Sequence, residues 1–227
     1  MILCFLSGIT VYSQTDNRFY TAFIQNNPTK WKEAMTTCIP AKSPQEKLLR
    51  MEYLYGYIGW CIRDQNKPEG AYYLDLFKKY LKDDILPEYY QQLYLSIAYG
   101  YGILLDTEKA MSAGPKSLRA INKAIDLDPE NPLGYIQKGN VMLKMPSIFG
   151  GSAHKALKYF AKAESLMEKK KNQPIQSWIY LHLLCTMSDL YQQENQCDIA
   201  KKYYNKIQAI EPELFWLKNF EKHKKDE

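Results

Sequence analysis

The sequence predicts an all-α protein, built as a superhelix (solenoid) of about four helix hairpins with capping helices. Between the prolines, apolar residues recur three and four positions apart, which is the period of an amphipathic helix. Strand signals are nearly absent, because the chain has no Asn-Gly turn and no sustained two-residue alternation. The 11 prolines are spaced as helix starts and stops would be.

The chain begins with an apolar stretch, residues 1–14, of the kind found in secretory signals. Val11 and Ser13 are small enough for the positions before a cleaved bond, so residues 1–13 are predicted to be a signal peptide. An exported protein of the periplasm or cell envelope is therefore expected. No Lys or Arg precedes the apolar run, which leaves a start codon placed too late, or a buried first helix, as alternatives. Residues 14–43 are predicted to be N-terminal capping helices.

The repeats are predicted over residues 44–212, and the last unit is the clearest. Its two helices carry large apolar residues around one pair of small residues, Ser188 and Ala200. A small pair lets two antiparallel helices approach closely, and Pro212 then stops the second helix.

The ends of the repeat region carry their own signals. In the segment Ser43-Pro-Gln-Glu46, Ser43 can cap a helix, proline fits its first turn and Glu46 can reach back to the cap. Residues 213–227 are predicted to be a C-terminal capping helix and a charged tail, with Phe215 and Trp216 facing inward, because an open repeat end exposes apolar surface.

These spacings resemble the tetratricopeptide repeat (TPR), whose period is about 34 residues. Two earlier units match as well, with insertions at 105–114 and 145–152, the second of which contains Phe149-Gly-Gly151. The chain is similar in these features to exported TPR proteins of Gram-negative bacteria. It is similar more distantly to the T component of TRAP transporters, where a Phe-Gly-Gly turn precedes the second helix of a repeat. The resemblance covers residues 44–218 and implies a fold; it does not imply one function, since such arrays bind many different partners.

The composition excludes several classes of protein. With 46% hydrophobic and 24% charged residues, the chain has the composition of a soluble folded protein. Its 30 basic and 25 acidic residues make a mixed surface, so no nucleic-acid partner is expected. Beyond residues 1–12 there is no long uncharged apolar run, so no integral membrane segment is expected in the mature chain.

The cysteines indicate neither a metal site nor a cofactor. The chain has no Cys-x-x-C motif and no Cys/His cluster with metal-ligand spacing, so neither is predicted. Although an exported protein permits disulfides, the favoured interpretation is four buried thiols that act as small hydrophobes. They are Cys38, Cys61, Cys185 and Cys197.

No catalytic constellation is found, and the chain is predicted not to be an enzyme. His223 lies in the charged tail, and His154 lies in the first turn of a predicted helix. His182 precedes Cys185 by three residues, so the two side chains can be neighbours on a helix. Nothing in the sequence lowers the thiol pKa, however, which a nucleophilic pair would need.

The candidate site is the concave groove that the first helix of each hairpin lines in TPR superhelices. Residues that flank the core positions on those helices are the candidate ligand contacts. They are Trp60, Arg63, Tyr99, Asn140, Lys144, His182, Asp189 and Gln193.

Three loop residues are further candidates. Gly150 and Gly151 can supply backbone angles that other residues resist, while Phe149 plugs the groove and Ser152 caps the next helix; alternatively, exposed amides there could hold an anion. Lys116 is a cation in a predicted first helical turn, where it opposes the helix dipole. It is expected to pair with Asp106 or Glu108, or else with a bound carboxylate.

The predicted function is non-catalytic binding of a protein or peptide partner in the groove, where Asn140, Lys144 and Asp189 fix its orientation. The alternative is a small-molecule-binding accessory of a transporter. A peptide binder predicts an open channel, whereas a small-molecule binder predicts a closed pocket plugged at one end by the inserted loops. An enzyme would need a polar cluster that converges from several helices.

Overall fold

A computed structural model of the chain describes residues 17–38, 41–169 and 177–218. These residues form helices and connecting turns, and contain no strand. The predicted all-α class is therefore confirmed. The α-helices are α1 (Asn17–Ile24), α2 (Pro28–Cys38), α3 (Pro44–Arg63), α4 (Lys67–Asp83), α5 (Glu88–Leu105), α6 (Ala110–Leu127), α7 (Pro132–Lys144), α8 (Ala153–Lys169), α9 (Trp178–Gln193) and α10 (Cys197–Ile210), with short 3-10 turns η2 (Thr107–Lys109) and η3 (Ser147–Phe149).

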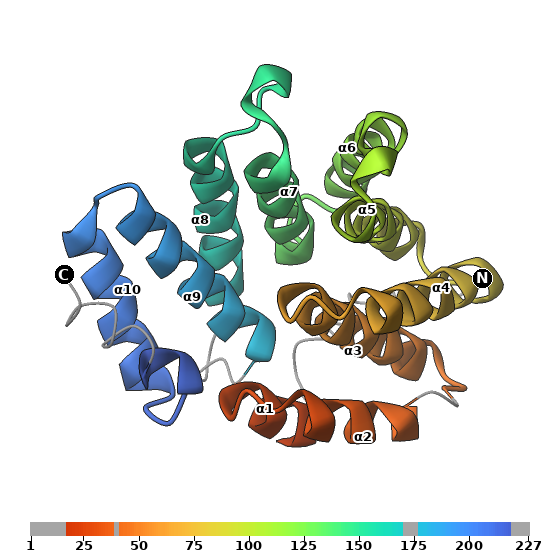
Figure 1. Ribbon diagram of the computed structural model, residues 1–227, viewed down its shortest axis with the longest axis horizontal. Helices are drawn as coiled ribbons and strands as arrows, with labels where there is room; N and C mark the ends of the chain where they lie inside the picture. Colours follow the sequence, from red (N-terminus) through yellow and green to blue (C-terminus); the bar gives the residue numbers. More distant parts are fainter. Residues whose placement is uncertain (1–16, 39–40, 170–176, 219–227) are drawn as a thin grey trace, which may run out of the picture.

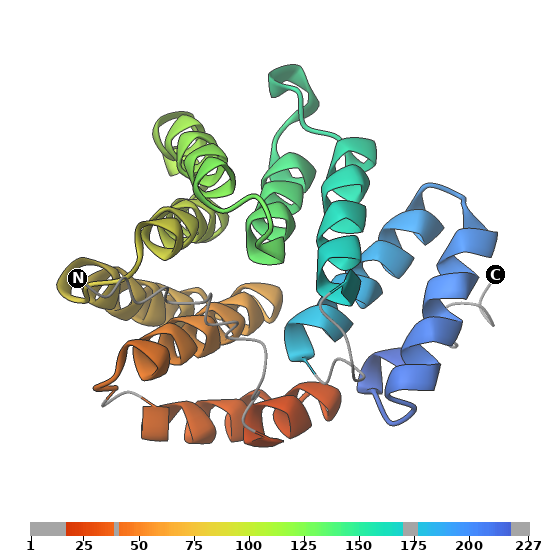
Figure 2. The same cartoon turned by 180° about the vertical axis from the view of Figure 1, so that it is seen from behind.

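The helices pack as successive hairpins that follow one another around a ring (Figure 1), and the inner helices of that ring line a small central hollow. Each odd-numbered helix packs against the even-numbered helix that follows it, and each hairpin packs against the next. Residues of α3, α5, α7 and α9 line the hollow, so the first helix of these hairpins is the inner one, as expected. Seen from either side, α1 lies beside the C-terminal hairpin while α2 lies along α3, so that the first hairpin completes a ring (Figures 1 and 2).

The helix starts follow the predicted chemistry in most hairpins. Ser43 and Glu46 form a capping box at the start of α3, with Pro44 in its first turn. Pro115 is the exception, because α6 begins at Ala110 and Pro115 lies inside the helix. Because proline lacks an N–H group, Pro115 in the second turn removes the hydrogen bond that the Met111 carbonyl would otherwise accept.

Small residues mark the close approach of paired helices. The Ser188 hydroxyl donates to the Ala200 carbonyl at 3.0 Å, which confirms the predicted contact between these two positions. The same arrangement recurs between α5 and α6, where the Ser117 hydroxyl donates to the Ser96 carbonyl at 3.0 Å. In the next hairpin, Gly139 lies against the Phe160 ring.

The inserted loop between α7 and α8 is held by its glycines. Gly150 has a left-handed backbone, with φ of +89°, and a Cβ at Gly151 would lie 1.9 Å from the Met145 carbonyl oxygen. Ser152 caps α8, because its hydroxyl accepts from the Lys155 backbone N–H at 3.0 Å. The expectation that Phe149 plugs the groove is wrong: 59% of this residue is exposed, at the tip of the loop.

The two ends of the helical array meet. The Tyr20 hydroxyl on α1 donates to the Glu211 carboxylate, just after α10, at 3.0 Å. Phe23 on α1 packs at 6.0 Å from Trp178, the first residue of α9. Gly56 on α3 makes room for this junction, because a Cβ there would lie 2.5 Å from the Trp31 ring.

After α10, the chain turns back over the last hairpin. Leu214 and Leu217 are buried there. Phe215, which was expected to face inward, is 38% exposed, while Trp216 packs at 6.3 Å from the Tyr204 ring. The inward positions are therefore spaced three apart, as on one face of a helix.

The thiols divide between core and surface. Cys61 and Cys185 are free and buried, as predicted, but Cys197 is exposed at the start of α10. The prediction for the Cys38 side chain lies outside the described residues, as do the predicted signal peptide and His223. Among the described residues, no helix is long and apolar enough to span a bilayer.

Candidate functional site

The candidate site is a small pit at the centre of the ring, where four inner helices converge. Its free volume is about 20 Å³, which is room for about one water molecule. Apolar and aromatic side chains dominate the wall, together with one carboxylate and one amide. The lining residues are Glu52, Tyr55, Leu93, Tyr94, Ile97, Leu133, Ile136, Gln137 and Ile179.

Glu52 is the acidic group of the pit. The Trp178 indole N–H donates to its carboxylate at 2.9 Å, and no Lys or Arg lines the pit. Burial raises the pKa of this carboxyl from 4.5 to about 7, and the hydrogen bond from Trp178 opposes the rise. Near neutral pH, Glu52 can therefore accept a hydrogen bond as a carboxylate or donate one as an acid.

Tyr55 connects three of the inner helices. Its ring stacks on Tyr101 of α5 at 5.7 Å, and the Tyr101 hydroxyl donates to the Tyr55 carbonyl at 2.9 Å. Its hydroxyl is hydrogen-bonded to Asn140 of α7, while burial raises the pKa of Tyr55 to about 12. The phenol is thus a neutral, fixed group with one apolar face on the hollow.

Asn140 is therefore the predicted groove residue that the structure connects to the pit. Gln137, one helical turn before it, donates from its amide to the Ser96 hydroxyl at 3.2 Å. Both amides are held by side chains of the neighbouring inner helices, so they can orient a ligand without first being ordered.

The predicted contacts on α3 and α5 lie away from the pit. Trp60 is buried against Trp31, with ring centroids 4.8 Å apart. Arg63 is exposed and binds Asn26 and Asp64 through its guanidinium. Tyr99 is partly buried, with the Lys116 ammonium 6.0 Å above its ring.

Four more predicted contacts are exposed. Lys144 ends α7 and Gln193 ends α9. Asp189 accepts a hydrogen bond from the Trp216 indole at 3.3 Å. The His182 imidazole lies 6.3 Å from the Phe23 ring, and desolvation by its neighbours together with the charge of Arg63 lowers its pKa. The predicted groove set is therefore dispersed, and it does not form one site.

The loop candidates have structural partners. Lys116 is in the second turn of α6, because that helix starts five residues before Pro115, and its ammonium lies over Tyr99. Asp106, the expected partner of Lys116, pairs instead with Lys109 at 3.0 Å. Gly150 and Gly151 shape the loop, and the Gly150 carbonyl accepts from the Lys155 ammonium at 2.8 Å.

Cys185, the nucleophile considered in the sequence analysis, lies in surroundings that disfavour its reactive thiolate form. Burial raises the pKa of the Cys185 thiol well above its usual range, and the charge of Asp189 adds to the rise. The side chains of His182 and Asp189 contact Phe23 and Trp216, respectively. These three residues consequently do not form an activated thiol. No cluster of metal-ligating side chains occurs in the described parts of the chain either.

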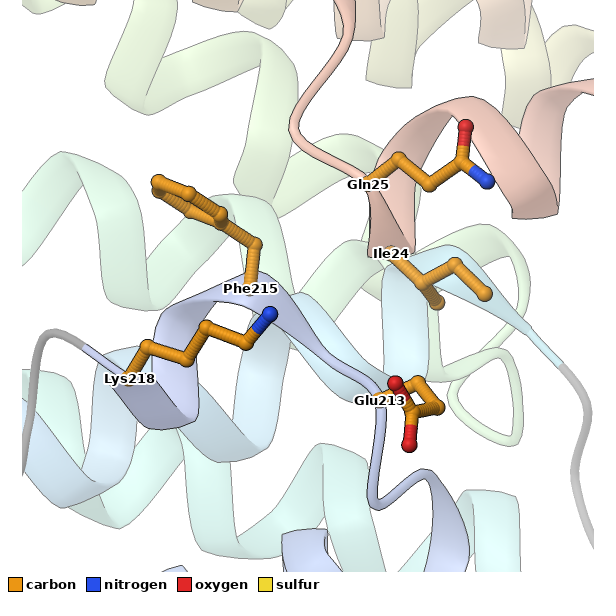
Figure 3. Close-up of a pocket in the computed structure, with 5 residues that line it drawn as sticks. All are labelled: Ile24, Gln25, Glu213, Phe215 and Lys218. Atoms are coloured by element: carbon orange, nitrogen blue, oxygen red, sulfur yellow. The ribbon is translucent and has the colours of Figure 1, made fainter.

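A larger hollow lies between the two ends of the array (Figure 3). It has a volume of about 400 Å³ and is lined by Ile24, Gln25, Glu213, Phe215 and Lys218. None of the five is buried, and Glu213 and Lys218 are both exposed. We therefore place the candidate site in the central pit, where polar groups are buried and held by neighbours.

Sequence reasoning missed Glu52 and Trp178. Glu52 stands four residues after Leu48 and three before Tyr55, so it is an acid within an apolar stripe of α3. Such an interruption is a usable signal for a functional polar group. The pairing with Trp178, by contrast, joins residues 126 apart and depends on closure of the ring.

The architecture defines a class: an all-α protein of stacked helix hairpins, closed into a ring around a lined pit. Among solved structures, the chain is similar to the HusA haemophore from Porphyromonas gingivalis, with a TM-score of 0.54 and 18% identity over 81% of this chain and 94% of that chain. At this identity the likeness shows a shared fold. No family model and no curated protein sequence matches the chain.

Proposed function

We propose that the chain is a non-catalytic binding protein that holds a small organic ligand with a flat apolar surface at the concave wall. The observation that carries this proposal is the convergence of four inner helices on one pit of aromatic and aliphatic side chains. Its few polar groups, Glu52, Gln137 and Asn140, are already held by neighbours. This composition, apolar with a few fixed polar groups, is that of small-molecule sites.

Two observations narrow the class of ligand: the similar solved structure and the aromatic side chains at the pit. The similar solved structure is named a haemophore, a carrier of a flat macrocycle. In this chain Tyr55 lines the pit and stacks on Tyr101, and an aromatic ring of this kind can pack against a flat ligand. Because the pit holds about one water molecule, a porphyrin would bind only after the inner side chains turn or the ring opens.

A protein or peptide partner is the second candidate. The stacked hairpins, with small residues such as Ser188 and Gly139 at their crossings, support TPR-like repeats, and TPR arrays bind peptides. The contact between Tyr20 and Glu211 favours the small ligand, because it joins the two ends of the array, whereas an extended peptide needs an open groove. The small-molecule hypothesis had predicted that the inserted loops plug one end of the pocket, but no residue of these loops lines the pit. The ring is instead closed by α1 and the segment after α10.

We further propose export to the periplasm or envelope, in agreement with the apolar first residues. The N-terminal mass of the mature protein tests this. A chain that begins at Gln14 supports export, and an intact Met1 contradicts it.

Titration with protoporphyrin IX and with haemin tests the ligand class. We expect porphyrin absorbance to shift on binding and the tryptophan fluorescence of the protein to be partly quenched, because the Trp178 indole, one of four, binds Glu52 in the pit. Tyr55→Ala should weaken binding at least about tenfold, since a stacked aromatic contributes about 1 kcal/mol or more. Tyr72→Ala, at a residue that is 65% exposed outside the pit, is the matched control and should bind like wild type.

Circular dichroism and thermal melting establish that both variants are folded. Since a ligand that binds the folded state raises the melting temperature, porphyrin should raise it for wild type and Tyr72→Ala alike. Absence of binding by wild type, or equal binding by Tyr55→Ala, would contradict the proposal. Saturable binding of extended peptides without porphyrin binding would favour the second candidate.

A further inference from the structure

The hairpin formed by α7 and α8 is rich in lysine and carries no acidic residue from the start of α7 to residue 163 of α8. Between Glu130 and Glu164 the sequence contains no Asp or Glu, although the chain has 25 acidic residues. The same stretch contains five lysines and one histidine. They are Lys138, Lys144, His154, Lys155, Lys158 and Lys162.

The structure divides these cations into two groups. Two lysines contact neighbouring side chains: the buried Lys138 binds Asn122 through its ammonium, and the ammonium of the exposed Lys162 lies 5.8 Å above the Tyr135 ring. Three more lysines and one histidine are exposed at the end of α7 or within the first two turns of α8. They are Lys144, His154, Lys155 and Lys158.

The loop between the two helices carries an exposed apolar tip. Ile148 is 84% exposed and Phe149 is 59% exposed, in the 3-10 turn Ser147–Phe149. Both views of the ring show this loop projecting beyond the neighbouring hairpins (Figures 1 and 2). Large apolar side chains on such a projection are the kind of exposure that marks an interaction site.

The loop is also pre-organised. The Gly150 backbone N–H donates to the Ser147 carbonyl at 2.8 Å, and the Ser152 backbone N–H donates to the Met142 carbonyl at 3.1 Å. Gly151 packs so closely on Met145 that no other residue fits. The fixed backbone of the loop therefore holds Ile148 and Phe149 in exposed positions.

We propose that this loop tip, residues 147–149 with Lys144, His154, Lys155 and Lys158, contacts the surface of an anionic lipid bilayer. Ile148 and Phe149 enter the boundary between headgroups and acyl chains, and the ammonium groups of the three lysines lie among lipid phosphates. Apolar residues flanked by lysines are the pattern of interfacial membrane binding.

A bilayer fits this surface better than a protein does. A stable protein interface buries about 800 Å² on each partner around an apolar core. A projecting turn with two apolar side chains is convex, and it cannot supply such a core. Insertion into a bilayer needs no complementary pocket, because the lipids rearrange around the side chains.

Flotation of the full chain with vesicles tests the proposal. Wild type should float with vesicles of phosphatidylcholine mixed with phosphatidylglycerol, and at least about tenfold less with phosphatidylcholine alone, because anionic lipid attracts each lysine. High salt should reduce the bound fraction, since screening weakens this attraction. Ile148→Ser/Phe149→Ser and Lys144→Gln/Lys158→Gln should each reduce binding about tenfold or more.

Matched controls come from exposed residues elsewhere. Ile85→Ser changes an isoleucine that is 90% exposed, and Lys201→Gln/Lys202→Gln removes two exposed cations from α10. Both controls should float like wild type. Equal loss in a control and in the loop-tip variants would overturn the proposal, and so would failure of wild type to bind anionic vesicles. Retention on an acidic protein resin without vesicle binding would also overturn it, in favour of a protein partner.

Discussion

At the scale of single residues, the burial of Glu52 has the widest consequences. In the unfolded chain this carboxyl ionises near its ordinary pKa of 4.5, whereas in the folded protein burial raises the pKa to about 7. The folded state therefore binds the Glu52 proton more tightly than the unfolded state does. Protonation of Glu52 thus stabilises the fold, and ionisation destabilises it.

The sign of this linkage gives a testable pH dependence. As pH rises from about 4.5 to 7, the free energy of unfolding should lose up to about 3 kcal/mol through Glu52, with no further loss from this group at higher pH. Glu52→Gln keeps the shape and cannot ionise. The difference between its stability and that of wild type should change across this window in urea titrations.

Because Glu52→Gln is compared with wild type at each pH, the effects of other titrating groups, such as His182, cancel. A suitable control is Glu33→Gln, at an exposed residue of α2. Its stability should run parallel to that of wild type. Parallel curves for Glu52→Gln would contradict the assignment of the pit carboxyl.

At the scale of helices, the fold depends on how closely the two helices of a hairpin approach. Gly139 on α7 packs against the Phe160 ring of α8, and a Cβ there would lie 2.3 Å from that ring. A ring between two helices cannot move aside without separating them. Glycine is needed at this position for the space it leaves.

Gly139→Ala should therefore destabilise the protein by about 1–3 kcal/mol, the usual cost of overpacking a core. Gly114→Ala is a matched control, because nothing lies within 4 Å of the added Cβ in α6. It should be neutral or stabilising by up to about 1 kcal/mol, since alanine is the better helix residue. Urea denaturation measures both. Equal effects of the two substitutions would contradict this account of the α7–α8 contact.

The helices themselves were accessible from the sequence, because their signals are local. The capping box at Ser43 and the pair of Ser188 with Ala200 follow from residue spacing, and both are confirmed. Pro115 was misassigned as a helix start, since proline is tolerated in an early turn as well as at the first position. Phe149 was placed in the groove because spacing gives no direction for a side chain on a loop.

At the scale of the whole molecule, closure of the array decides where the site lies. Trp178 of α9 reaches Glu52 of α3 and Phe23 of α1 because the last hairpin comes back to the beginning of the array. An open superhelix would have left the groove residues predicted from repeat spacing on one continuous wall. The candidate site could not be predicted from the repeat pattern, because no local sequence signal indicates that α1 and the segment after α10 are in contact.

The closing contact can be measured by a double-mutant cycle. Tyr20→Phe and Glu211→Gln each remove one partner of the hydrogen bond that joins α1 to the end of α10. We expect a coupling energy of about 0.5–1.5 kcal/mol, the net contribution of one hydrogen bond. A coupling energy of zero would mean that the ends do not meet in solution. Thermal unfolding of the four proteins provides the measurement.

The meeting of α1 with the segment after α10 also bears on how the protein comes apart. In open repeat arrays each unit contacts only its neighbours, so terminal units can fray while the middle stays folded. Here the two terminal hairpins contact each other, through α1 and α9 and through the hydrogen bond of Tyr20 with Glu211. If one terminal hairpin unfolds, the other therefore loses packing contacts as well. Amide hydrogens of α2 and α10 should consequently exchange at comparable rates, in one cooperative opening.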